Sequence, residues 1–237
     1  MSSTQPRLPT KSDFPSSLTL DIIPPSTGSP VNILILLHGL GDTQNLNLPE
    51  TACISLRGPN PIPAIFTGSE TPAFHWGDDV LVDEARGDIE LDAGFSTTQK
   101  ILAEIIQDVL IAKCNYPARN ILLLGFGQGG MAALNFASSF SEELGGIVSI
   151  GGRLPASSKS GAKSKTPVLV CGGSRSTQVT KSAIEGLKER FLDVEYVKWD
   201  KREDSMMKNR EEALPVMKFF ARRLRSRAGV PEGAVEV

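Results

Sequence analysis

Histidine is scarce in this sequence, because 237 residues contain only two, His38 and His75. No imidazole occurs anywhere after residue 75. Histidine is the side chain that most often serves as a general base near neutral pH. The sequence therefore excludes any catalytic or metal site that needs a histidine from the C-terminal two-thirds of the chain.

Cysteine is also scarce, and its distribution excludes two kinds of site. The three cysteines are Cys53, Cys114 and Cys171, an odd number at wide spacings with no C-x-x-C pair. A disulfide framework needs paired cysteines, and a structural zinc site needs closely spaced thiolate or imidazole ligands. We expect three reduced, buried thiols, no metal and no cofactor.

Long apolar runs and strong net charge are missing as well. The longest apolar run, Ile33–Leu37, is far too short to span a bilayer. A formal net charge of −2 gives no overall attraction to nucleic acid or membranes. The N-terminal stretch MSSTQPRLPTKSDFPSS has no apolar core of a secretory signal. These features predict a cytoplasmic protein, with the nucleus left open and the oligomeric state undetermined.

The composition that remains is that of one globular domain. Apolar residues make up 40% of the chain and charged residues 22%, which is typical of a folded protein of this length. A Ser-, Thr- and Pro-rich stretch predicts a flexible arm over residues 1–16. We expect a single domain over residues 17–227 and a tail over residues 228–237.

Strand and helix patterns alternate along the predicted domain. Ser17–Ile23 alternates apolar and polar residues like an outer strand, and Val31–Gly39 contains a continuous apolar run, like a strand buried on both faces. Further predicted strands are Ala64–Thr67, Ile121–Leu124, Gly146–Ile150, Val168–Cys171 and Val194–Val197. Predicted helices are Phe95–Lys113, Gly130–Phe140, Val179–Phe191 and Asn209–Arg225. This alternation predicts an α/β fold with a mostly parallel sheet covered on both faces.

Two motifs are specific enough to suggest a family. The first is LLHGLGD (Leu36–Asp42), directly after the buried strand. The second is LLLGFGQGGMAAL (Leu122–Leu134), a strand, a glycine-rich turn and the start of a helix. The second pattern is that of the G-x-S-x-G nucleophile elbow, in which a sharp turn exposes a serine above the sheet. Here Gly127 occupies the position of the serine.

Both motifs resemble the acyl-protein thioesterase/carboxylesterase family, in which they read HGLGD and GFSQGG. FHWGDD (Phe74–Asp79) is similar to the tryptophan-bearing loop of that family, and IVSIGGRLP (Ile147–Pro155) to one of its turns. The order of elements agrees from about Val31 to Leu224. The resemblance implies an α/β-hydrolase fold.

The resemblance also implies positions for the catalytic groups. Backbone N–H groups at Leu40 and Gln128 match those that form the oxyanion hole of the family. The acid of the family falls near Ser176, in a loop that reads SRSTQ, and its histidine falls at Asp204 or a near neighbour. His38 belongs to the first motif, where the resemblance gives it a structural role. His75 lies on the tryptophan loop and is interpreted as a packed or solvated side chain.

Loss of nucleophile, acid and histidine together predicts that the chain does not hydrolyse esters by the mechanism of the family, because a serine hydroxyl needs a base. We expect a non-catalytic protein with a binding or scaffold role. The alternative is an esterase or thioesterase that uses an unrecognised constellation, such as a serine–lysine pair. The glycine-rich turn lacks the Lys-Ser/Thr of a phosphate-binding loop, and Cys171 has no later histidine as a partner.

Charge is distributed unevenly along the sequence. Between Glu70 and Asp92 eight acidic residues accompany one basic residue, Arg86, whereas from Leu144 to Ile184 all charged residues are basic. Exposed faces and loops explain most such runs. The alternative is a surface for a protein partner. Its candidate contacts are Lys159, Lys163 and Lys165.

Overall fold

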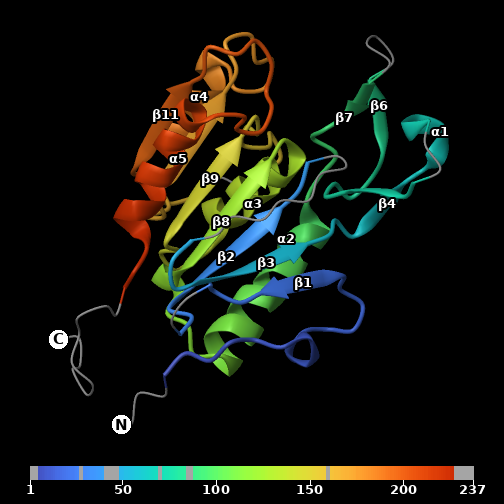
Figure 1. Cartoon of the computed structure of the whole chain (residues 1–237). Coiled ribbons are helices and arrows are strands. Elements are labelled where there is room, and N and C mark those ends of the chain that lie inside the picture. The colour runs from blue at the N-terminus through green and yellow to red at the C-terminus, as the bar shows by residue number, and fades with distance from the viewer. Residues whose placement is uncertain are drawn as a thin grey trace.

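The centre of the computed structural model, which describes residues 5–26, 29–39, 48–68, 71–83, 88–158 and 161–226, is a seven-stranded sheet (Figure 1). Its strand order is β1-β3-β2-β8-β9-β10-β11, and only the β1–β3 pair is antiparallel. The strands are β1 (Leu20–Ile23), β2 (Asn32–Leu37), β3 (Thr51–Leu56), β8 (Ile121–Phe126), β9 (Gly146–Ile150), β10 (Val168–Gly172) and β11 (Val194–Lys198). The predicted mostly parallel sheet is confirmed.

Helices cover both faces of this sheet (Figure 1). Their bounds are α2 (Ser96–Ala103), η2 (Glu104–Lys113), α3 (Gln128–Ser139), α4 (Lys181–Arg190) and α5 (Arg210–Arg223), with short helical turns at Lys11–Asp13, Ala64–Thr67 (α1) and Ala118–Asn120. The predicted helix over Phe95–Lys113 changes within its length from α-helical to π-helical hydrogen bonding. Among the described residues, no helix has the length and apolar character needed to cross a membrane.

The central strands are apolar on both sides because each face packs against helices. In β2, Ile33, Ile35 and Leu37 face the cluster that also contains residues of α2, η2, α3 and α4. The alternate residues Leu34 and Leu36 face a second cluster, to which α5 contributes. This arrangement explains the uninterrupted apolar run from which the strand is predicted.

One predicted strand is wrong. Ala64–Thr67 forms the short helix α1 rather than a strand. Pro63, with a φ of −56°, precedes it, and Gly68 ends it in the left-handed region at a φ of 60°. A proline at the start and a left-handed glycine at the end are helix boundary signals. They outweigh the β propensity of Ile65 and Phe66.

Five strands lie outside the predicted ones. Besides β3, an excursion between β3 and α2 contains two small antiparallel pairs, β4 (Asn60–Ile62) with β5 (Ala73–His75) and β6 (Leu81–Asp83) with β7 (Asp88–Glu90). Strands of three residues are too short to show a periodic pattern. Figure 1 shows this excursion, with α1, at one side of the molecule.

Part of the predicted flexible arm differs from expectation, because residues 7–14 pack against the domain. Arg7 donates two hydrogen bonds to the Asp13 carboxylate, and its backbone N–H donates to Cys114 O at 3.1 Å. The Phe14 side chain is buried in the larger core cluster. One apolar anchor and one ion pair order this Ser- and Pro-rich stretch. The predicted tail over residues 228–237 lies outside the described residues.

Candidate functional site

The candidate site lies where the parallel strands end. In open α/β sheets, ligands bind beyond the carboxyl ends of the strands. The loops that follow β8, β9, β10 and β11 meet there, and they carry the Gly127 turn, the glycine pair Gly151–Gly152, Ser176 and Asp204. Contacts between these loops define the geometry of the site.

The turn between β8 and α3 has the backbone conformation of a nucleophile elbow. Gly127 has a φ of 51° and a ψ of −118°, and its N–H donates to Ile150 O at 2.8 Å. The neighbouring Gly129 must lack a side chain, because a Cβ there would lie 2.3 Å from Leu37 O. A Cβ at Gly127 would have no heavy atom within 4 Å. The turn therefore keeps space for a side chain that it does not carry.

Gln128, the first residue of α3, has two functions in the structure. Its backbone N–H belongs to the first helical turn, where N–H groups have no partner within the helix. Its buried side chain accepts a hydrogen bond from Trp76 N at 2.7 Å and donates one to Leu91 O at 3.0 Å. This side chain fastens the tryptophan loop to the elbow. Leu40, the second predicted oxyanion residue, lies outside the described residues.

Ser176 and Asp204 contact each other directly. The Ser176 hydroxyl donates to Asp204 Oδ2 at 2.6 Å, and Gly173 N donates to Asp204 Oδ1 at 2.8 Å. The Ser176 oxygen in turn accepts from the N–H groups of Gln178 and Val179. Both carboxylate oxygens and the hydroxyl thus have hydrogen-bond partners within the protein. The two positions assigned by resemblance to the acid and the histidine are joined by a hydrogen bond.

The glycine pair after β9 connects Asp204 with the elbow. A Cβ at Gly151, whose φ is 68°, would lie 2.7 Å from Asp204 Cβ. A Cβ at Gly152 would lie 2.6 Å from Gly127 O. Because Gly151 and Gly152 have no side chains, the loop after β11 and the elbow can both pack closely against this glycine pair. Asp204 and Gly127 lie on either side of it.

Lys201 holds the loop that contains Asp204. Its ammonium group donates to Ser205 O at 2.6 Å and Met206 O at 3.0 Å, and it pairs with Glu212 of α5 at 3.0 Å. The same group lies 4.0 Å from the ring centroid of Trp199. These contacts fix the loop between β11 and α5 and hence the position of Asp204.

Sequence reasoning missed a second polar connection, made by Arg153. This side chain donates to Asp92 Oδ2 at 3.1 Å and, through Nε, to Gln178 Oε1 at 3.1 Å. Ala156 N also donates to Asp92 Oδ2. A chain of hydrogen bonds thus runs from Asp92 through Arg153 and Gln178 to Ser176. The pairing joins positions 61 residues apart, and the only signal for it was that Asp92 ends an acidic segment while Arg153 belongs to a segment whose charged residues are all basic.

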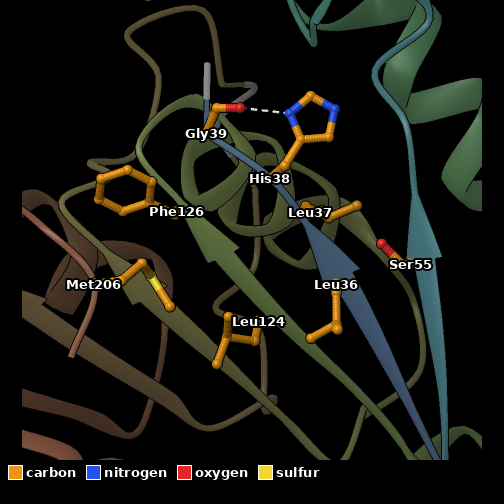
Figure 2. A pocket seen from close by; sticks show the side chains of 8 residues that line it. All are labelled: Leu36, Leu37, His38, Gly39, Ser55, Leu124, Phe126 and Met206. Atoms are coloured by element: carbon orange, nitrogen blue, oxygen red, sulfur yellow. Dashed lines mark hydrogen bonds between the residues drawn. The ribbon is translucent and has the colours of Figure 1, made fainter. Parts of the chain in front are cut away.

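Neither histidine occupies the position of a general base at the elbow. His38 Nε2 accepts from Gly58 N at 2.8 Å, and its Nδ1 contacts Gly39 O (Figure 2). The Trp76 indole donates to His38 O at 2.8 Å. His38 therefore supports the loop structure, as the resemblance implies.

His75 is buried in β5, and the burial lowers its pKa, so the neutral imidazole is favoured. No described residue bonds to its Nδ1. It is a packed side chain, as interpreted from the sequence. The thiol of Cys171 is also buried, and burial raises its pKa to about 12. A thiol with this pKa is not a nucleophile at neutral pH.

A mostly apolar pocket lies beside the elbow (Figure 2), and several of its residues belong to the core cluster to which α5 contributes. Met206, from the loop held by Lys201, forms one wall, and the Ser55 hydroxyl group lines the opposite one. The lining residues are Leu36, Leu37, His38, Gly39, Ser55, Leu124, Phe126 and Met206. Across the described residues, no group of three His, Cys, Asp or Glu side chains is placed to hold a metal ion.

The lysines proposed as partner contacts differ in their surroundings. Both Lys163 and Lys165 are exposed, and Lys163 donates from Nζ to Lys188 O at 2.7 Å, near the C-terminal end of α4. Lys159 lies outside the described residues. The acidic and basic segments meet at one point in the structure, because Asp92 pairs with Arg153.

Comparison with known proteins identifies the family of this chain. A family model described as phospholipase/carboxylesterase matches residues 20–221. This chain belongs to that family. A hydrolase of Mycosarcoma maydis, named as uncharacterized, is 31% identical over 221 residues, which cover 86% of this chain and 80% of the relative.

Two further comparisons have either a lower coverage or a lower sequence identity. An uncharacterized hydrolase of Schizosaccharomyces pombe is 38% identical over 138 residues, 53% of this chain, and the match spans only 55% of that relative. The crystal structure of acyl-protein thioesterase 2 from Zea mays has a TM-score of 0.61 at 20% identity, over 87% of this chain and 99% of that one. The family member thus has the α/β-hydrolase fold.

Proposed function

We propose that this chain is a non-catalytic member of the phospholipase/carboxylesterase family with a binding or scaffold role toward a protein partner. The observation that carries the proposal is the Ser176–Asp204 hydrogen bond near an elbow whose central residue, Gly127, has no side chain. In a Ser-His-Asp site the serine attacks, the imidazole takes its proton, and the acid orients the imidazole. A glycine, a serine and an aspartate at these positions perform none of these three steps.

The hydrogen-bond pattern also argues against an alternative nucleophile among the paired residues. The Ser176 hydroxyl donates a hydrogen bond to Asp204, and its oxygen accepts hydrogen bonds from two backbone N–H groups. A nucleophilic serine needs a strong enough base and an unoccupied line of attack. The second condition is not met, because two backbone N–H groups occupy the acceptor side of the Ser176 oxygen. The pair is better suited to holding the two loops together.

The test is hydrolysis of a short-chain p-nitrophenyl ester and of an acyl thioester by the purified protein. We expect rates equal to those with the heat-denatured protein. A catalytic member of the family from the same expression host serves as the positive control. Turnover that disappears when one serine of this chain is replaced would contradict the proposal and would identify the nucleophile.

The loop that contains Lys159, Lys163 and Lys165 remains a proposed contact for the protein partner. Lys163 and Lys165 are both exposed, but the ammonium group of Lys163 already bonds to Lys188 O of α4. Lys165→Glu should therefore weaken binding of an acidic partner more than Lys163→Gln.

A further inference from the structure

The strand β11 forms one edge of the central sheet. It pairs with β10 and ends the strand order, so among the described residues its outer side pairs with no strand (Figure 1). At the opposite edge the N-terminal segment contacts β1, where Lys11 donates to Asp21 at 2.9 Å. The two edges therefore differ, and the β11 edge is the one at which a further strand can pair.

Backbone hydrogen bonds show how β11 is oriented. Just before the strand, Asp193 O accepts from Val168 N at 2.9 Å, and just after it Trp199 N donates to Gly172 O at 2.8 Å. In a parallel pair, alternate residues of a strand bond to its neighbour. The odd-numbered residues of β11 therefore direct their backbone N–H and C=O groups toward β10.

The even-numbered residues of β11 direct these groups away from the sheet. They are Val194, Tyr196 and Lys198. Within the described part of the chain, no backbone or side-chain group makes a hydrogen bond to these outward N–H and C=O groups. The outward groups are centred on Tyr196, the middle residue of the strand.

The side chains along this edge give it little protection from pairing. Edge strands are commonly protected by proline, by bulges or by charged side chains. β11 contains no proline, and Lys198 at its end is the only charged residue among the three that face outward. Tyr196 is 40% exposed, and Leu192 just before the strand is 64% exposed. Large apolar side chains thus remain in water close to the outward backbone groups.

This edge is complementary to itself. If two β11 strands run antiparallel with Tyr196 opposite Tyr196, then Val194 of each lies opposite Lys198 of the other. All three outward residues then form hydrogen-bonded pairs. No outward group of either strand is left without a partner.

The charges of the strand are compatible with this register. Glu195 lies opposite Val197, so no two like charges are directly opposed, which would be destabilising. The two Glu195 side chains are diagonal neighbours, and each is neutralised by Arg222 of its own chain. Lys198 lies diagonally from Tyr196 of the second copy, within reach of the aromatic ring.

Other symmetric registers satisfy the edge less well. A pair centred on Lys198 places two ammonium groups opposite each other. A pair centred on Val194 leaves the outward groups of Lys198 without a partner in β11 of the second copy. A pair centred on an odd-numbered residue opposes backbone groups that already bond to β10. The register centred on Tyr196 is therefore favoured.

We infer that two copies of this chain associate through β11, antiparallel, with a two-fold axis at Tyr196 and one continuous sheet across the dimer. The same surface is used by both copies, so the contact closes at the dimer. The inference concerns the edge of the sheet and does not depend on whether the candidate site is catalytic.

Sedimentation velocity of the full chain over a range of concentrations tests the association. The weight-average mass should rise from that of a monomer to that of a dimer and no further. Tyr196→Lys and Tyr196→Glu should each stay monomeric, because two like charges meet on the axis. An equimolar mixture of these two variants should form a heterodimer. Ile65→Lys, which introduces the same charge at an exposed apolar residue of α1, is the matched control and should dimerise like the wild type.

Amide hydrogen exchange of the wild type tests the strand pairing without any variant. The outward amides of Val194, Tyr196 and Lys198 should exchange about tenfold more slowly at a concentration where about nine-tenths of the chain is dimeric, because they exchange only from the monomer. The amides of Glu195 and Val197, which face β10, should show no such dependence on concentration.

Three results would overturn the inference. The first is a wild-type chain that stays monomeric at every concentration. The second is a dimer that forms equally well in Tyr196→Lys, or a mixture of the two charged variants that stays monomeric. The third is a wild-type dimer in which the outward amides of β11 exchange as rapidly as in the monomer.

Discussion

The turn at Gly127 keeps a backbone conformation that most side chains tolerate poorly. With a φ of 51° and a ψ of −118°, it lies in a region that is costly for residues with a Cβ. In active hydrolases a residue with a side chain adopts this strained conformation, because the turn exposes the nucleophile. Glycine adopts the same conformation without a steric penalty. Gly127 thus preserves the turn without backbone strain, and it has no side chain that could act as a nucleophile.

Replacing Gly127 by serine should lower the free energy of unfolding by about 1 kcal/mol. A Cβ at this position meets no heavy atom within 4 Å, so backbone strain is the cost that we expect. Urea unfolding measures the change. Gly186→Ser is the matched control, because this glycine also has open space but lies within α4 without a positive φ. There we expect no loss, since serine is the better helix former. Equal effects at both positions would refute the strain argument.

Between elements, the loops at the carboxyl edge of the sheet are joined by side chains rather than by backbone pairing. Arg153 bridges the segment before α2 to the loop after β10, and Asp204 bridges that loop to the one after β11. The Asp92 side chain is 9% exposed and that of Arg153 is 28% exposed. A partly buried pair of this kind leaves an uncompensated charge when one member is removed.

Arg153→Met should therefore destabilise the protein by about 1–3 kcal/mol, because Asp92 would lose its ionic partner while staying buried. The control is Arg222→Met at the exposed pair with Glu195, whose side chains are 50% and 40% exposed. Exposed pairs contribute about 0–1 kcal/mol. Chemical denaturation of both variants provides the comparison. A smaller loss of unfolding free energy in Arg153→Met than in Arg222→Met would show that the Arg153–Asp92 pair does not stabilise the fold.

At the scale of the whole molecule, the sequence predicted those elements whose residue pattern directly reflects their position in the fold. Continuous apolar runs identified β2, β8 and β10, since a strand covered on both faces has no polar side. The glycine-rich motif located the elbow, because a sharp turn with close strand–helix packing requires glycine. Resemblance then placed Ser176 and Asp204, and the structure joins them by a hydrogen bond.

The parts that were not predicted depend on contacts distant in sequence. The strands of the excursion have three residues each, which is too few for a periodic signal. The short strand prediction at Ala64–Thr67 failed because Pro63 and Gly68 determine a helical turn locally. Asp92 and Arg153 are ordinary charged residues until the fold brings them together. Phe14 likewise has no periodic context that would reveal its burial.

We propose that this chain retains the hydrolase fold without a nucleophile, an acid and a histidine at the positions where the family carries them. The most direct measurement is intact-mass detection of labelling by a fluorophosphonate probe. The proteins compared are the wild type and the triple variant Gly127→Ser, Ser176→Asp, Asp204→His. We expect an unlabelled wild type and stoichiometric labelling of the triple variant at position 127, because it would hold a nucleophile, an acid and a base in the family order. Stoichiometric labelling of the wild type at any serine would contradict the account.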